Sequence, residues 1–309
     1  MRRVLLLIGL LGLLAACGGS SSITAPKVAK KPGLIGGAAS AGSVKSYKPT
    51  GKIVADDGFR PWVDGFGFEN YGNDVGPENM TAAEVEDLFG RQVCVRGTGD
   101  RCRLTPVAQE WMRAENSRMA GGHCMGFSVT AIEFYKRVRK PKDYGAKTTF
   151  GLPIQGNVSL QSLLAENWTF QDLASVEQER IVGTPKVVLQ TLVDALNDPK
   201  GEIYTIAIFK RDGTGGHAIT PYAVEDQGNG KQNVLVYDNN FPGVTREISF
   251  DRNADTWSYI GGPNPDDTNQ QYEGDASTKS LSLLMRGIRK RCYLSPQNGW
   301  MPVHLSFRH

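Results

Sequence analysis

The sequence predicts an α+β domain in which helices come first and an antiparallel β-meander follows. From about residue 80 to 197, helix start signals and apolar residues at helical spacing dominate. After Asp198 the apolar residues recur at every second position, and turn-forming residues separate the short runs. We therefore expect a helical half at about 80–197 and a sheet half at about 200–260.

The first helices are predicted from their N-terminal residues. Thr81 and Glu84 form a capping box before an apolar run. Thr105-Pro106 places proline at the first position of a second helix, which we expect to end near Met119. Two further helices are expected at about 160–166 and 186–196.

A central helix is expected from Cys124 to Arg139, where Pro141 stops it. Its apolar residues surround most of the helix circumference, which is typical of a helix buried in the middle of its domain. We therefore expect this cysteine-bearing helix to pack against the sheet half.

Turn sequences separate the strands of the second half. Asp212-Gly213, Asn229-Gly230 and Phe241-Pro242-Gly243 connect consecutive runs and favour antiparallel pairing. The strands are expected at 203–209, 217–224, 234–238, 244–250 and 257–260. We expect packed loops and short strands at 58–72, a polar loop at 261–276 and a last helix at 282–291.

The N-terminus has the pattern of an export signal. Arg2 and Arg3 precede an unbroken apolar run of 13 residues, Val4 to Ala16. This run is too short to span a bilayer, which needs about 20 residues, so we interpret residues 1–17 as a signal peptide. The ending Leu-Ala-Ala-Cys17 resembles a bacterial lipobox, which implies that Cys17 becomes the lipidated first residue of the mature protein.

The lipobox resemblance implies a protein of the bacterial cell envelope that is anchored to the membrane through its lipid. Gly18 is not acidic, which favours the outer membrane over the inner membrane. An ordinary secretory signal that ends near a cysteine by chance is the alternative. Residues 18–50 are rich in Gly, Ser, Ala and Lys and are expected to form a flexible tether before a domain at 51–309.

Charge and motif content exclude several classes of partner. The net charge of the 309 residues is +3, and without Arg2 and Arg3 it is +1, which argues against a nucleic-acid partner. No His and Cys spacing suits zinc. Gly213-Thr-Gly-Gly lacks the Gly-Lys-Ser/Thr of a phosphate-binding loop. We expect no cofactor, no metal and a monomer.

The remaining cysteines suggest one disulfide and leave one question open. Cys94 and Cys102 enclose a short Gly-containing loop, and in an oxidising compartment we expect them to form a disulfide. Cys124 and Cys292 are then either bonded to each other or each a free thiol.

Two similar Gly-Gly-His sequences contain the candidate chemistry. Gly121-Gly-His-Cys124 places a thiol at the start of the central helix, where the helix dipole and backbone N–H groups favour a thiolate. Gly215-Gly-His217 places a histidine at the start of a strand. If the next hairpin closes near Gly228, His217 and Asp238 become diagonal neighbours on one sheet face. Asp238 would orient the imidazole, and Asn240 and Asn239 are the alternatives.

Three motifs resemble those of the papain-like cysteine peptidase superfamily, in the bacterial branch similar to bacteriocin-leader peptidases. They are GGHCMGFS at 121–128, GGHAITPYAVED at 215–226 and VLVYDNN at 234–240. The resemblance covers roughly residues 91–250. It implies a papain-like fold, a peptide or protein substrate, and a triad of Cys124, His217 and Asp238.

The chain departs from the superfamily pattern at one position. The superfamily usually has a Gln a few residues before the cysteine, which completes the oxyanion hole. Residues 114–118 read AENSR and contain no Gln. Asn116 could replace it, or the backbone N–H of Cys124 could act alone.

Together these observations predict an exported, lipid-anchored thiol hydrolase, a cysteine peptidase that cleaves amide bonds. Two alternatives remain open: a non-catalytic surface lipoprotein that uses the fold for binding, and an amidase or transglutaminase-like acyl transferase. The state of Cys124 separates enzyme from binder, because a disulfide with Cys292 would leave no nucleophile.

Overall fold

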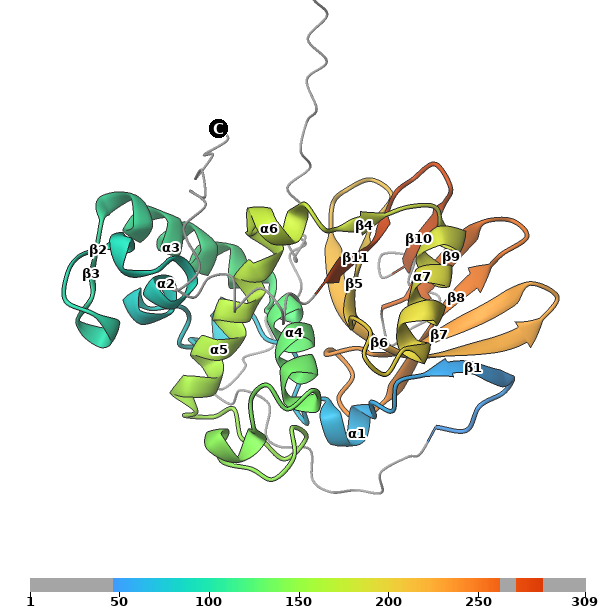
Figure 1. Cartoon of the computed structure of the whole chain (residues 1–309), viewed down its shortest axis with the longest axis horizontal. Helices are drawn as coiled ribbons and strands as arrows, with labels where there is room; N and C mark the ends of the chain where they lie inside the picture. Colours follow the sequence, from blue (N-terminus) through green and yellow to red (C-terminus); the bar gives the residue numbers. More distant parts are fainter. Residues whose placement is uncertain (1–46, 262–270, 286–309) are drawn as a thin grey trace, which may run out of the picture.

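Helices occupy much of the chain before Asp198 and strands most of it afterwards, as the change in apolar spacing predicts. The structure is a computed structural model, and it describes residues 47–261 and 271–285. The two halves lie side by side, with most helices on the left and the sheet on the right, where α7 packs on it (Figure 1). The α+β class is therefore confirmed. Among the described residues, no helix has the length and apolar character needed to cross a membrane.

The helices begin where their capping signals predict. Thr81 accepts a hydrogen bond from Ala83 N–H and donates its own backbone N–H to Glu84, which completes the capping box. Thr105 caps the next helix through Ala108 N–H. The helices are α1 (Pro61–Asp64), α2 (Ala82–Phe89), α3 (Pro106–Arg118), α4 (Cys124–Tyr135), α5 (Val158–Trp168), α6 (Ala174–Glu177) and α7 (Pro185–Asn197).

The main sheet has nine antiparallel strands in the order β10-β9-β8-β7-β6-β5-β11-β4, with β1 paired to the far part of β6. The five strands from β5 to β9 form the expected meander. The strands of this sheet are β1 (Lys52–Asp56), β4 (Ile181–Val182), β5 (Tyr204–Phe209), β6 (Gly216–Gly228), β7 (Lys231–Tyr237), β8 (Thr245–Asp251), β9 (Thr256–Ile260), β10 (Gln271–Asp275) and β11 (Leu281–Met285).

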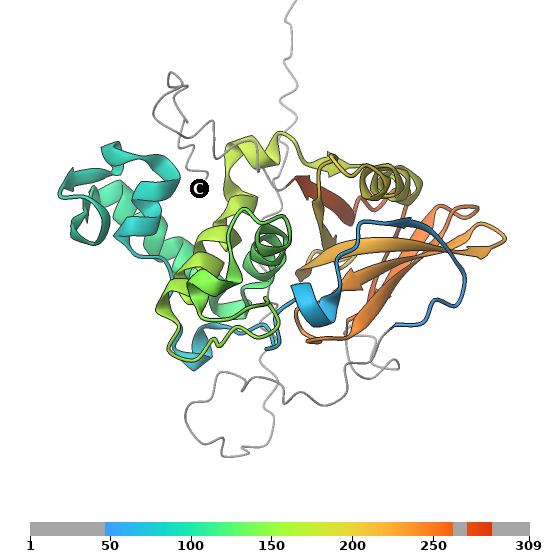
Figure 2. The same cartoon turned by 60° about the horizontal axis from the view of Figure 1, so that its bottom comes forward.

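Helices α4 and α7 cover opposite faces of this sheet (Figures 1 and 2). In β6, Ala218 packs with the start of α4, whereas its neighbour Ile219 packs with Leu189 and Leu192 of α7. Successive side chains of a strand point to opposite faces, so the sheet separates two apolar cores. One core lies between the sheet and the helical half, and the other lies under α7.

Helix α4 is the buried centre of the molecule, as its apolar circumference predicts. Its residues 124–134 are all buried between α5 and the sheet. Gly126 permits the close approach of α5, because a Cβ there would lie 2.0 Å from the carbonyl oxygen of Leu164. The helix ends at Tyr135 and not at the predicted Arg139, because Arg137 adopts a left-handed φ of 57°.

Two predicted segments in the C-terminal part are wrong. Residues 281–285 form strand β11 rather than the start of a helix, and 286–291 lie outside the described residues. β11 pairs with β5 and β4 along its two edges, and residues 281–284 are buried on both faces, so no exposed polar face marks it as a strand. Within the predicted polar loop, residues 271–275 form the edge strand β10, whose polar character suits an edge.

Two N-terminal predictions also change. The aromatic segment 58–72 contains the short helix α1, with Pro61 at its first position, and no strand. The end of the predicted tether belongs to the fold, because Tyr47 donates a hydrogen bond to Glu225 Oε2 at 2.6 Å. Cys17, Cys292 and the rest of the tether lie outside the described residues.

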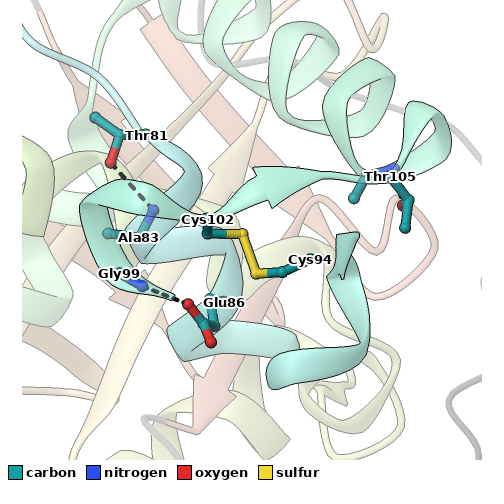
Figure 3. The surroundings of a disulfide bond; sticks show 8 residues. Thr81, Ala83, Glu86, Cys94, Gly99, Cys102 and Thr105 are labelled. Atoms are coloured by element: carbon teal, nitrogen blue, oxygen red, sulfur yellow. Dashed lines mark hydrogen bonds between the residues drawn. A yellow bond between two sulfur atoms is a disulfide. The ribbon is translucent and has the colours of Figure 1, made fainter. Parts of the chain in front are cut away.

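The Cys94–Cys102 disulfide is confirmed (Figure 3). It joins the two sides of a small hairpin made of β2 (Cys94–Arg96) and β3 (Arg103–Leu104). Glu86 of α2 accepts a hydrogen bond from Gly99 N–H, which holds the tip of this hairpin against the helix. The disulfide therefore stabilises a short hairpin within the helical half.

Candidate active site

Cys124 is the first residue of α4, and its side chain is buried. The first intrahelical hydrogen bond runs from Phe127 N–H to the carbonyl of His123. The backbone N–H groups of the first turn therefore point toward the N-terminal end of the helix, where the thiol lies. This end of the helix dipole favours a negative sulfur.

His217 is the second residue of β6 and pairs with Ile208 of β5. The preceding Gly216 lies against an aromatic ring, because a Cβ there would be 2.7 Å from Phe209. The β5–β6 hairpin closes through Lys210 N–H and the carbonyl of Gly215. This local geometry places the imidazole at the end of the strand, beside the start of α4.

Asp238 directly follows β7, and the strand register brings it to His217. Thr220 pairs with Tyr237, so Asp238 falls opposite Ile219, two residues from His217 on the same face. The Nε2 atom of His217 lies 2.8 Å from Oδ1 of Asp238. The diagonal arrangement expected from the hairpin is therefore present.

The Asp238 carboxylate is fully buried and accepts three hydrogen bonds. They come from His217, from the backbone N–H of Asn240 at 2.8 Å, and from the hydroxyl of Tyr259, which binds Oδ2. Tyr259 lies in β9, two strands from β7, and the sequence contains no local signal for its role. A buried carboxylate is tolerated here because its oxygens have donors.

These contacts determine the protonation of the pair. Burial by itself raises the pKa of Asp238, but the charge of His217 and the hydrogen bonds from His217 and Tyr259 hold it below the usual 3.8. Burial lowers the pKa of His217, but the Asp238 charge and hydrogen bonds to Asp238 and Cys124 outweigh it and raise that pKa to about 10. At neutral pH the pair is an imidazolium and a carboxylate.

His217 thus contacts both other members of the predicted triad. Its Nε2 atom binds Asp238, so Nδ1 is the nitrogen that remains for the hydrogen bond with Cys124. A protonated imidazole beside a thiol at a helix start stabilises the thiolate. The arrangement can therefore supply a nucleophile, an acid and base, and an orienting carboxylate.

His123 is excluded from this group although it neighbours Cys124. Its Nδ1 lies 2.7 Å from the carbonyl oxygen of Tyr71, and its Nε2 lies 2.9 Å from Oδ1 of Asn79. Burial lowers its pKa to about 4. Both ring nitrogens are therefore engaged, and the ring anchors the loop before α4.

The three alternative asparagines have other contacts. Asn116 donates from Nδ2 to the carbonyl of Met80 at 2.9 Å and accepts from Met80 N–H, so its amide holds the chain before α2. Asn239 donates to the carbonyls of Cys124 and Ala218, which ties α4 to β6. Asn240 Nδ2 lies 3.4 Å from His217 Nε2, which is longer than an ordinary hydrogen bond.

Asn70 contacts the same loop and was not singled out from the sequence. Its Oδ1 accepts a hydrogen bond from the backbone N–H of His123 at 2.7 Å, and its own backbone N–H donates to the carbonyl of Asn239 at 2.9 Å. Asn70 thus bridges the loop after β7 and the loop before Cys124. It comes from the aromatic segment outside the three motifs.

Among the described residues, the group with metal-ligand spacing is Glu86 with Cys94 and Cys102. The two sulfurs are bonded to each other, so this group offers no thiolate ligand.

Comparison with known proteins adds no assignment. The chain matches no protein-family model, and no curated protein or solved structure is significantly similar to it. The function is therefore inferred from the chain's own residues.

Proposed function

We propose that this protein is a thiol hydrolase of the papain-like type that cleaves amide bonds in a peptide or protein substrate. The main support is the position of His217, which is hydrogen-bonded to buried Asp238 on one side and to Cys124 at a helix start on the other. The arrangement of a buried cysteine-bearing helix between other helices and an antiparallel sheet also supports a papain-like fold. Export and a lipid anchor on Cys17 are part of the same proposal.

The reaction follows from the roles of the three side chains. At neutral pH His217 is already an imidazolium, whose charge Asp238 stabilises, and it forms an ion pair with the thiolate of Cys124. The thiolate attacks the amide carbonyl, and the new S–C bond pushes an electron pair onto the oxygen. When the C–N bond breaks, His217 gives its proton to the leaving amine. Water, deprotonated by His217, then hydrolyses the thioester, and the Cys124 thiolate leaves beside the imidazolium that this step restores.

The first test is the pH dependence of Cys124 alkylation in the purified full-length chain, followed by peptide mass spectrometry. The thiolate is expected to titrate well below the free value of about 8.5. In His217→Ala the titration should return toward that value. An inert Cys124 that is recovered cross-linked to Cys292 would overturn the proposal and favour a non-catalytic lipoprotein.

Substrate class is tested with a mixed-sequence peptide library, with Cys124→Ala as the control for contaminating peptidases. New peptide termini that disappear in Cys124→Ala support a peptidase. Deamidated side chains with intact peptide bonds would instead indicate an amidase. Products that incorporate an added primary amine would indicate acyl transfer.

A further inference from the structure

In the proposed function, on which this inference rests, the Cys124 thiolate attacks a carbonyl carbon, and each donor at the carbonyl oxygen accelerates the attack. Negative charge develops on this oxygen, and a hydrogen-bond donor placed beforehand stabilises it. The first turn of α4 supplies backbone N–H groups. Asn116 is engaged with Met80 and does not supply the second donor.

The side-chain amide of Asn70 lies at this end of α4. The segment that contains Asn70 runs beside the loop before Cys124, although it precedes His123 by 53 residues in the chain. The close approach depends on Gly122, which has a φ of +135°. A Cβ on Gly122 would lie 2.7 Å from Nδ2 of Asn70. Nδ2 therefore packs against the backbone two residues before the thiol.

The orientation of this amide is determined by its neighbours. His123 N–H can only donate, so the atom that accepts it at 2.7 Å is the oxygen of Asn70. Nδ2 is then the other end of the amide, and it makes no hydrogen bond with any residue in the described ranges 47–261 and 271–285. Asn70 is half-buried, so Nδ2 remains within reach of a ligand.

We propose that Nδ2 of Asn70 is the side-chain donor to the substrate's carbonyl oxygen in the reaction of Cys124. As the S–C bond forms, the carbonyl electron pair moves to the oxygen, which accepts an N–H from Asn70 and one from the first turn of α4. When the C–N bond breaks, the carbonyl reforms. The donor thus comes from an N-terminal segment, and Gly122 is required because any side chain there would displace the amide.

The test compares two reactions of the same thiolate in the full-length chain. Iodoacetamide is attacked at a tetrahedral carbon, so no oxyanion forms. p-Nitrophenyl acetate is attacked at its carbonyl, and the released nitrophenolate reports acylation of Cys124. Asn70→Ala is expected to slow acylation about 10- to 100-fold and to change the iodoacetamide rate less than about 2-fold, with both rates measured above the thiol titration.

Two further variants separate donor loss from damage to the loop. Asn70→Asp keeps an oxygen for His123 N–H and removes the Nδ2 donor, so it should slow acylation as Asn70→Ala does. Gly122→Ala should displace the amide and have the same selective effect. Asn253→Ala is the matched control, because Asn253 is exposed and bonds the carbonyl of Asn229 in a distant turn.

Equal slowing of both reactions in the Asn70 variants would show that Asn70 only supports the loop, and this would overturn the inference. Unchanged acylation would also overturn it. An iodoacetamide titration of Cys124 with the same midpoint in wild type and in His217→Ala would refute the proposed function itself. The failure of the proposed function and the failure of this inference are thus distinguishable.

Discussion

Replacing Tyr259 with Phe removes a single group from the candidate site, the hydroxyl that donates to Oδ2 of Asp238. The ring remains, so its packing beside Tyr272 at a centroid distance of 6.4 Å is retained. Burial and the nearby Asp238 charge raise the pKa of Tyr259 well above 10, so the hydroxyl is a donor throughout the range of the assay. The hydroxyl also has a hydrogen bond with the Arg246 side chain, so the substitution removes this contact together with the hydrogen bond to the buried Asp238 charge.

The expected magnitude follows from that bond. A hydrogen bond to a charged group contributes about 1.5–3 kcal/mol, so Tyr259→Phe should lower the free energy of unfolding by about this amount at pH 7. Because the lost hydrogen bond favours the charged form, the pKa of Asp238 should rise in this variant. Asp238 has a pKa below 3.8 in the wild type, so it stays ionised at neutral pH.

The pH dependence has a definite sign. A carboxyl whose pKa is lower in the folded state stabilises the fold above the unfolded pKa of about 4, and this stabilisation disappears as pH falls through the folded pKa. The difference between Tyr259→Phe and wild type should therefore be constant from about pH 5 to 8. It should shrink below about pH 4, where a neutral acid replaces the carboxylate.

Urea-induced unfolding between pH 8 and pH 3 measures this difference. Tyr71→Phe is the matched control, because the buried Tyr71 hydroxyl has no hydrogen-bond partner among the described residues. The control should destabilise much less than Tyr259→Phe. The reasoning is refuted if Tyr259→Phe lies within about 0.5 kcal/mol of wild type at pH 7, or if its effect stays constant down to pH 3.

Two further predictions concern groups outside the site. Burial and the nearby Asp172 charge raise the pKa of Glu115 from 4.5 to about 7, so the free energy of unfolding should fall as pH rises through this interval. Glu115→Gln should remove that fall and be about 1–3 kcal/mol more stable than wild type at pH 8; equal urea curves at pH 8 would contradict this. Replacing Cys94 and Cys102 by Ser should cost about 2–3 kcal/mol, and reduced wild type should unfold like the double variant. A double variant as stable as oxidised wild type would contradict the role of the disulfide.

Helix starts and consecutive hairpins are predictable here because their signals act over a few residues. The Thr81 capping box and the Thr105-Pro106 start are hydrogen bonds and backbone restrictions within one turn. Short turns between β5 and β9 likewise impose antiparallel neighbours. Because the β6–β7 hairpin sets the register, the proximity of His217 and Asp238 also follows from local sequence.

Strands β10 and β11 are not predictable in the same way. β11 leaves the meander and returns beside β5, so its residues are buried by elements that lie far away in the sequence. Residues 281–284 are buried on both faces, the polar Ser282 included, so the strand has no exposed polar face of the kind that alternation detects. It becomes a strand because the folded sheet offers it the edge of β5 for pairing.

The supporting residues of the site depend on tertiary structure as well. Tyr259 reaches Asp238 across the sheet, and Asn70 reaches the loop before Cys124 from an N-terminal segment. Asn116 is the side-chain amide in the stretch before Cys124 where the superfamily usually has Gln, but it binds Met80 instead. Residue types and short spacings thus determine the three central side chains and the elements on which they lie. The donors around them are decided by contacts between distant segments, because a hydrogen bond forms wherever folding brings a donor and an acceptor together, whatever their separation in sequence.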